Sequence, residues 1–235
     1  MAAVPFLTAA RLLGLAVPVL AGVVSVASPQ CAATPFAVQI GDVRLGMDAP
    51  PGFADTGFTG SPRLQELAEA LTPASNRILM FAITDADLRR FTVGDTIEAR
   101  RYMVAVTPRG LERDRTSPSA FTAFANDSLR GLGAPPPAGT TDYRKFLDGI
   151  PPGRPALLTE LRRDPEIVSV LQAARLPSEA RFDAPKYMLT TNTLLLVRGK
   201  VISLGVFGAY ESPEDLDWIR VITVRWIEEM QRLNR

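Results

Sequence analysis

The chain has 235 residues with 26 basic and 25 acidic side chains, a single cysteine and no histidine. This near-neutral balance argues against a nucleic-acid binder, which normally carries a net basic surface. Zinc sites rely on imidazole and thiolate ligands, and hydrolytic triads rely on a histidine base, so neither kind of centre is expected.

The first 33 residues differ in composition from the rest. Arg11 precedes an apolar run from Leu12 to Ala27, and small residues follow at Cys31 and Ala33. A charged start, a short apolar middle and a small-residue exit form a secretory leader. The run has about 16 residues, whereas a membrane-spanning helix needs roughly 20. We therefore expect cleavage after Ala33 and a periplasmic or secreted protein. An uncleaved membrane anchor and a lipid-modified Cys31 are the alternatives.

Cleavage would remove 33 of the 235 residues and leave 202, which we expect to form a single globular domain over 34–235. It would also remove Cys31, the only cysteine. The mature protein would then form no disulfide, so core packing must stabilise it.

The amino-terminal part of this domain alternates between strand and turn patterns. Two alternating runs around Gly41-Asp42 predict a hairpin over 36–47. A helix is expected from Ser61-Pro62 to just before Pro73, with serine as its cap and proline at its first position.

Buried strands and a second helix are expected next. Nearly continuous apolar runs predict strands at 77–84 and 101–107. Ser117-Pro118 starts the second helix. Six prolines within 133–155 indicate an irregular excursion, with short helices expected at 143–147 and 156–163.

The final third is the most regular part of the sequence. Strands are predicted at 167–176, 186–197 and 201–210. The last helix opens at Ser212 with a variant capping box in which aspartate replaces glutamate. Its apolar residues recur at spacings of three and four between Leu216 and Leu233.

Two tryptophans lie on this last helix. Trp226 is central on the apolar stripe, so we expect it in the core. Trp218 lies nearer the edge of the stripe. We take Trp218 as the candidate partner contact, with a core position as the alternative.

These elements predict an α/β (α+β) fold with an antiparallel sheet of about five to seven strands covered by helices. The hairpin from Leu194 to Phe207, followed by Ser212-Pro-Glu-Asp-Leu, resembles the end of PsbP-like proteins. Val43-Arg-Leu-Gly-Met and Ala-Pro-Pro-Gly-Phe53 are similar to that family's opening strand and turn. The resemblance implies an α/β/α sandwich that closes with a long amphipathic helix. It also implies an exported accessory or binding factor without enzymatic activity, and it carries over no site residue.

Local motifs assign no catalytic, cofactor-binding or metal-binding residue. Ser203 lies in a partial G-x-S-x-G pattern, but valine replaces the first glycine and the chain has no histidine. Asp85-Ala-Asp87 is the closest match to a cation site. We interpret Asp85 as the cap of the following turn and Asp87 as a complement to its dipole.

Two further charged patterns leave alternatives open. Three arginine pairs are interpreted as solvated faces, with anion binding as the alternative; they are Arg89-Arg90, Arg100-Arg101 and Arg162-Arg163. Carboxylate pairs can act without histidine, as in glycosidases, but the residue order does not show which acids converge.

The sequence therefore predicts an exported, non-enzymatic accessory or interaction protein whose partner is an envelope protein. The alternative is a carrier or sensor of a small apolar or anionic ligand, and a carboxylate-only enzyme is the third class. An interaction protein predicts an exposed apolar patch, a carrier a closed apolar pocket, and an enzyme clustered acids with raised pKa values. We expect no cofactor, no bound nucleic acid and no permanent membrane anchor after cleavage.

Overall fold

A computed structural model describes residues 35–177 and 186–235. The expected leader and its cleavage site lie outside these residues. The described residues form a seven-stranded antiparallel sheet and a separate hairpin. The strands of the larger sheet are β3 (Phe53–Asp55), β4 (Asn76–Thr84), β5 (Arg101–Pro108), β6 (Pro155–Asp164), β7 (Ile167–Arg175), β8 (Tyr187–Val197) and β9 (Lys200–Tyr210).

Five α-helices accompany these strands in the described ranges. They are α1 (Pro62–Ala70), α2 (Asp85–Thr92), α3 (Pro118–Ser128), α4 (Tyr143–Asp148) and α5 (Pro213–Leu233). The strand order is β3-β4-β5-β9-β8-β7-β6, and every neighbouring pair is antiparallel. The long hairpins β6-β7 and β8-β9 therefore build one side of the sheet, and β3, β4 and β5 build the other.

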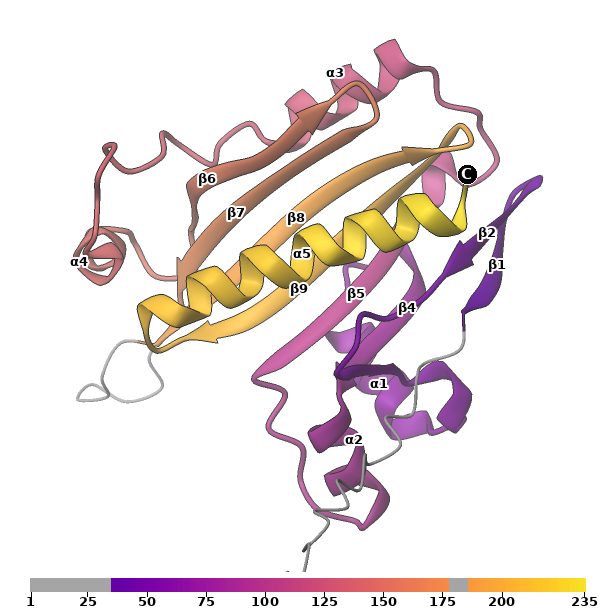
Figure 1. Cartoon of the computed structure of the whole chain (residues 1–235), viewed down its shortest axis with the longest axis horizontal. Coiled ribbons are helices and arrows are strands. Elements are labelled where there is room, and N and C mark those ends of the chain that lie inside the picture. Colours follow the sequence, from indigo (N-terminus) through magenta and orange to yellow (C-terminus); the bar gives the residue numbers. More distant parts are fainter. Residues whose placement is uncertain (1–34, 178–185) are drawn as a thin grey trace, which may run out of the picture. The chain divides into compact units, whose positions relative to one another are not determined.

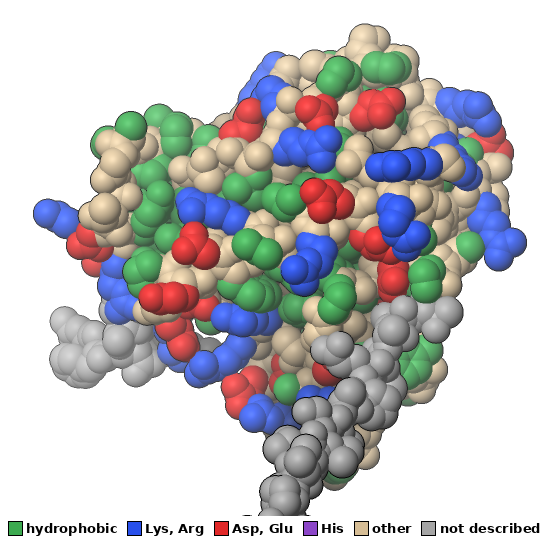
Figure 2. Space-filling view, in the orientation of Figure 1, with side chains coloured by type: hydrophobic (Ala, Val, Ile, Leu, Met, Phe, Trp, Pro, Cys, Tyr) green, Lys and Arg blue, Asp and Glu red, His purple; other side chains and the backbone are tan. Residues whose placement is uncertain are grey.

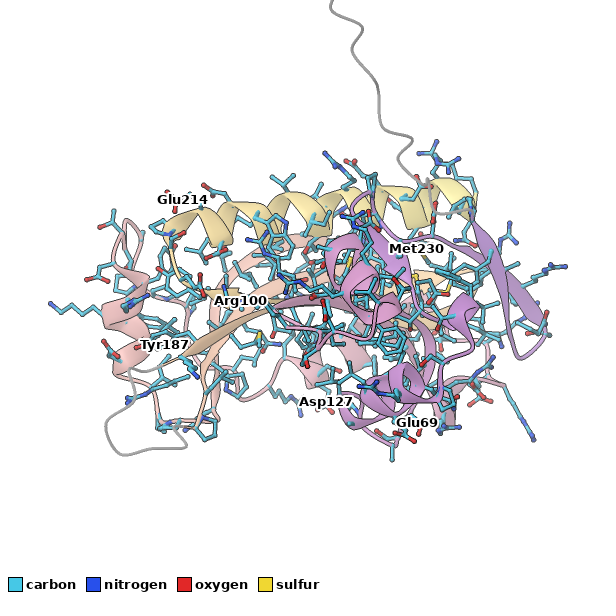
Figure 3. The ribbon with its side chains drawn as sticks, turned by 90° about the horizontal axis from the view of Figure 1, so that it is seen from below. Glu69, Arg100, Asp127, Tyr187, Glu214 and Met230 are labelled. Atoms are coloured by element: carbon cyan, nitrogen blue, oxygen red, sulfur yellow. The ribbon has the colours of Figure 1, made fainter. Side chains whose placement is uncertain are left out.

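Helices cover both faces of the sheet. Successive residues of a strand point to opposite faces, so the residue sets beneath each helix identify its side. On β5, Met103 and Ala105 pack in the core cluster that contains α5, whereas Tyr102 and Val104 pack in the cluster beneath α1 and α2. α3 packs over the same face as α1, at the far side of β8. Figures 1 and 3 show α5 along one face and α1 and α3 on the opposite face. The predicted α/β/α sandwich is thus confirmed.

The last helix supplies the largest buried side chain of the core. Trp226 is fully buried, as expected, and its indole Nε1 donates a hydrogen bond to the Asp48 carbonyl at 2.9 Å. The Asp215 carboxylate accepts hydrogen bonds from the backbone N–H groups of Glu211 and Ser212, which confirms the capping box. This cap fixes the start of α5 at the end of β9.

One expectation about secondary structure is corrected by the structure. Residues 156–163 form most of strand β6 rather than a short helix. Their composition suits a helix, but a turn at Pro165-Glu166 returns the chain so that β6 pairs along the whole of β7. Pairing with a neighbouring strand overrides local helix preference. The predicted hairpin is confirmed: β1 (Phe36–Ile40) and β2 (Val43–Met47) pair with each other in a separate two-stranded sheet.

This hairpin is attached to the carboxy-terminal end of α5. The Asn234 side chain accepts a hydrogen bond from Gly46 N–H and donates one to the Gly46 carbonyl, both at 2.9 Å. The amide thus pairs with both backbone groups of Gly46, much as a strand neighbour would. Apolar residues of β2 join the α5 side of the core beneath it.

A buried lysine fixes the other end of the hairpin. Lys200 is fully buried, and its Nζ donates to the carbonyl oxygens of Glu112 and Asp114 and to the Asp42 carboxylate, at 3.0–3.1 Å. All three donors of the ammonium therefore have acceptors. Gly41 has a φ of 55°, and a Cβ there would lie 2.4 Å from the Glu112 carbonyl oxygen, so only glycine suits this turn.

Candidate interaction surface

A surface groove lies between α5 and the turn that precedes β3. It has a volume of about 500 Å³. Apolar side chains form most of it: Pro51, Phe53, Trp218, Val221 and Ile222. Thr84, Arg101, Asp217 and Arg225 add polar groups around them. We call these nine residues, together with Gly52, the Trp218 groove.

Trp218 is held in place by residues from three other elements. Its ring lies 6.3 Å from the Phe53 ring, and the Arg101 guanidinium lies over it at 4.0 Å from the ring centre. A Cβ at Gly208 of β9 would lie only 2.8 Å from Trp218 Cζ3, so this glycine makes room for the indole against the sheet. The indole is half-buried and preorganised, with its open side facing the groove.

Trp218, the candidate partner contact predicted from the sequence, thus lies on a surface that several elements form together. Val221 lies three residues after Trp218 and is 59% exposed, and Val224 is 42% exposed a further three residues along. Spacings of three place these side chains along one side of α5. Figure 2 shows hydrophobic side chains interleaved with charged ones over the face that α5 covers. An exposed apolar strip beside a groove is typical of a protein-binding surface.

Some charged side chains at the groove have ion-pair partners within the described ranges and one does not. Arg101 pairs with Asp215 at 2.8 Å, and Asp217 pairs with Arg220 at 3.4 Å. Burial acts to raise the pKa of Asp215, but the N–H groups of Glu211 and Ser212 and the Arg101 guanidinium outweigh it, so the pKa is lowered. Arg225 forms no ion pair within the described ranges, and it leaves a cation at the rim for a partner's carboxylate.

A network of ion pairs adjoins the groove through Arg101. Glu98 pairs with Arg90 and, at 3.2 Å, with Arg100, and Arg100 also pairs with Glu211 at 3.0 Å. Figure 3 shows Arg100 near the middle of the molecule, below the level of α5. Because every arginine of this network has an acidic neighbour, the arrangement favours a solvated charged face over an anion site.

The other residues considered from the sequence take structural roles. Ser203 donates a hydrogen bond to Asn192 at 3.3 Å. Thr84, and not Asp85, caps α2, because its hydroxyl accepts from Asp87 N–H at 3.1 Å. Asp87 lies in the first turn of α2, is buried, and accepts hydrogen bonds from Thr84 Oγ1 and from Glu98 N–H. Arg162 and Arg163 pair with Asp164 and Glu160.

A second cleft, of about 800 Å³, lies between α1 and the outer edge of β4. Asp55 lines it, and burial raises the pKa of this carboxyl despite opposing hydrogen bonds from the N–H groups of Gly57, Phe81 and Thr56. Burial also raises the pKa of Asp48, but Asp48 does not line this cleft. Within the described residues the two raised carboxyls are therefore not gathered at one site.

Two further observations concern the part of the chain that the structure describes. No group of three or more histidine, cysteine, aspartate or glutamate side chains there is arranged to hold a metal ion. None of its helices has the length and apolarity that a membrane span requires. Comparison with known proteins adds no relative: no family model matches the chain, and no curated protein matches it.

Proposed function

We propose that the protein is exported and acts by binding another envelope protein through the Trp218 groove. The observation that supports this most is the preorganised, half-buried Trp218 beside the exposed Val221. Interfaces are centred on aromatic anchors that are rigid before binding, because little conformational entropy is then lost.

The chemistry of the groove defines the partner. An apolar side chain of the partner fills the space between Phe53 and Val221, where the groove walls are apolar. A carboxylate beside that side chain reaches Arg225 at the rim. Such an apolar anchor with a polar, charged rim is the usual anatomy of a non-obligate interface.

Export rests on the composition of the first 33 residues, and it places the protein in the periplasm or outside the cell. The PsbP-like resemblance favours the same role, since exported members of that family serve as accessory factors. A carrier of a small ligand is less favoured. A carrier needs a closed apolar pocket, whereas the Trp218 groove and the 800 Å³ cleft are both open to solvent.

Site-specific photo-crosslinking tests this proposal. A photoreactive amino acid replaces Val221 in the full-length chain, which is expressed in the native host. The matched control carries the same amino acid at Thr122, which is exposed on α3 on the opposite face. We expect one protein to crosslink at 221 and not at 122, and the substitution Trp218→Ala to abolish the crosslink. The same products at both positions, or none at 221, would overturn the proposal.

A further inference from the structure

The outer edge of β4 is only partly covered by its neighbour. β3 pairs with Ala82–Thr84, and the Thr56 N–H then donates to the Phe81 carbonyl at 2.8 Å. Beyond this point, along Asn76–Met80, the described chain places no strand on that side of β4. The outward-facing N–H and C=O groups of this five-residue stretch therefore have no ladder partner within the described residues, whereas its inward-facing groups pair with β5.

This unpaired stretch lines the 800 Å³ cleft. All of Asn76–Met80 contributes to it, and α1 forms the opposite wall with Gln65, Ala68 and Glu69. Phe36 of β1 lines it as well. Unpaired strand edges are usually shielded because they recruit other strands. Here α1 stands opposite the edge, so the cleft is open to a single chain segment and not to another sheet.

The cleft also holds two polar side chains, Thr72 and Arg109, with hydrogen-bonding capacity to offer a ligand. Thr72 lines the cleft, and its buried Oγ1 atom has no hydrogen-bond partner among the residues that the structure describes. A buried hydroxyl without a partner is unfavourable, so a ligand that supplies one gains a hydrogen bond. Arg109 lies at the same cleft, donates from Nε to the Ala74 carbonyl at 3.1 Å and forms no ion pair within the described ranges.

We propose that this cleft binds an extended peptide segment of a partner protein, which adds to β4 as a short strand. Main-chain hydrogen bonds to Asn76–Met80 provide affinity, as in other cases of strand addition. At about 3.3 Å per residue, the five-residue edge spans roughly 16 Å, which sets the length of the segment. An apolar side chain of the segment faces Ile78, on the α1 side of the strand, and an acidic one faces Arg109.

This site is separate from the Trp218 groove, because the two share no lining residue. The inference therefore stands whether or not the proposed function is correct. The substitution Val221→Asp, which disrupts the groove, is expected to leave peptide binding at β4 unchanged, so failures at the two sites are distinguishable.

The test uses peptides selected from a random decapeptide phage library on the protein purified after export. A selected peptide is synthesised with a fluorophore and titrated by fluorescence anisotropy. Gln65 is exposed and lines the cleft, whereas the next residue, Glu66, is exposed and does not. We expect Gln65→Trp to weaken binding at least about tenfold, or 1.4 kcal/mol, and Glu66→Trp to leave it unchanged.

Two further readouts distinguish strand addition from other binding. Cross-strand NMR contacts are expected between the peptide backbone and the backbone of Asn76–Met80, and Arg109→Glu is expected to disfavour peptides with an acidic residue. A library without binders, equal affinity for Gln65→Trp, or contacts confined to α1 side chains would overturn the proposal. A small molecule retained in the cleft and displacing every peptide would also contradict it.

Discussion

Lys200 shows how a single buried side chain can connect distant segments of this fold. It is one of only three lysines among 26 basic residues, and it is the only one that is buried. Its ammonium joins the β1-β2 turn to the segment that contains Glu112 and Asp114. The sequence predicted the Gly41-Asp42 turn but not this contact, because nothing local to the turn indicates a cation supplied from β9.

Lys200→Met is expected to destabilise the protein by about 3 kcal/mol, because it leaves two carbonyl oxygens and a carboxylate without their donor. Urea unfolding followed by circular dichroism measures the change. Lys186→Met, at an exposed position, serves as the control and should change the free energy of unfolding by less than about 0.5 kcal/mol. Equal stability of the two variants would show that the buried ammonium contributes nothing.

The stability that the Asp42–Lys200 ion pair contributes should also depend on pH. The hydrogen bond from Lys200, followed by that from Arg115, lowers the pKa of Asp42 from 3.8 to about 2. A lowered pKa in the folded state contributes stability that is present above pH 3.8 and is lost as the pH falls through about 2. We expect the gap in urea midpoint between wild type and Asp42→Asn to be constant above pH 5 and to shrink between pH 4 and pH 2. A gap independent of pH would contradict the contact.

At the scale of elements, sequence patterns correctly predicted the helices and strands whose boundaries depend on local residues. Ser-Pro starts, alternating runs and the capping box located α1, α3, α5 and the central strands. Residues 156–163 were mispredicted as helix because their leucines, glutamate and arginines suit a helix, and only pairing with β7 makes them a strand. β3 has three residues, too few to give a periodic signal, and its existence depends on the edge of β4.

The attachment of the hairpin to α5 is likewise non-local and can be tested. Asn234→Ala removes both hydrogen bonds to Gly46 and one to the Met230 carbonyl. We expect a loss of about 1–3 kcal/mol and faster amide hydrogen exchange in β1 and β2 than in β8 and β9. Glu228→Ala, exposed on the same helix, should leave exchange unchanged. Uniform exchange in the Asn234 variant would mean that the hairpin is held by other contacts.

At the scale of the whole molecule, the sequence patterns predicted an antiparallel sheet covered by helices and the family resemblance implied the sandwich, but neither predicted the assembled groove. Helical spacing placed Trp218 at the edge of the α5 stripe. Its neighbours Phe53, Arg101 and Gly208 come from three other elements, so only the folded chain brings them together. The β4 cleft was missed for the same reason: a free strand edge depends on where the neighbouring strand ends, and a sequence pattern does not mark that point.

Native mass spectrometry of the protein purified from a periplasmic extract tests the central claim most directly. We predict a mature chain that begins at Thr34, in a complex with one other protein, and the loss of that complex in Val221→Asp but not in the matched Thr122→Asp. Both positions are exposed, so neither change should cost more than about 0.5 kcal/mol of stability. A full-length chain retained in the membrane, a complex unaffected by Val221→Asp, or a small-molecule adduct in place of a protein would contradict the account.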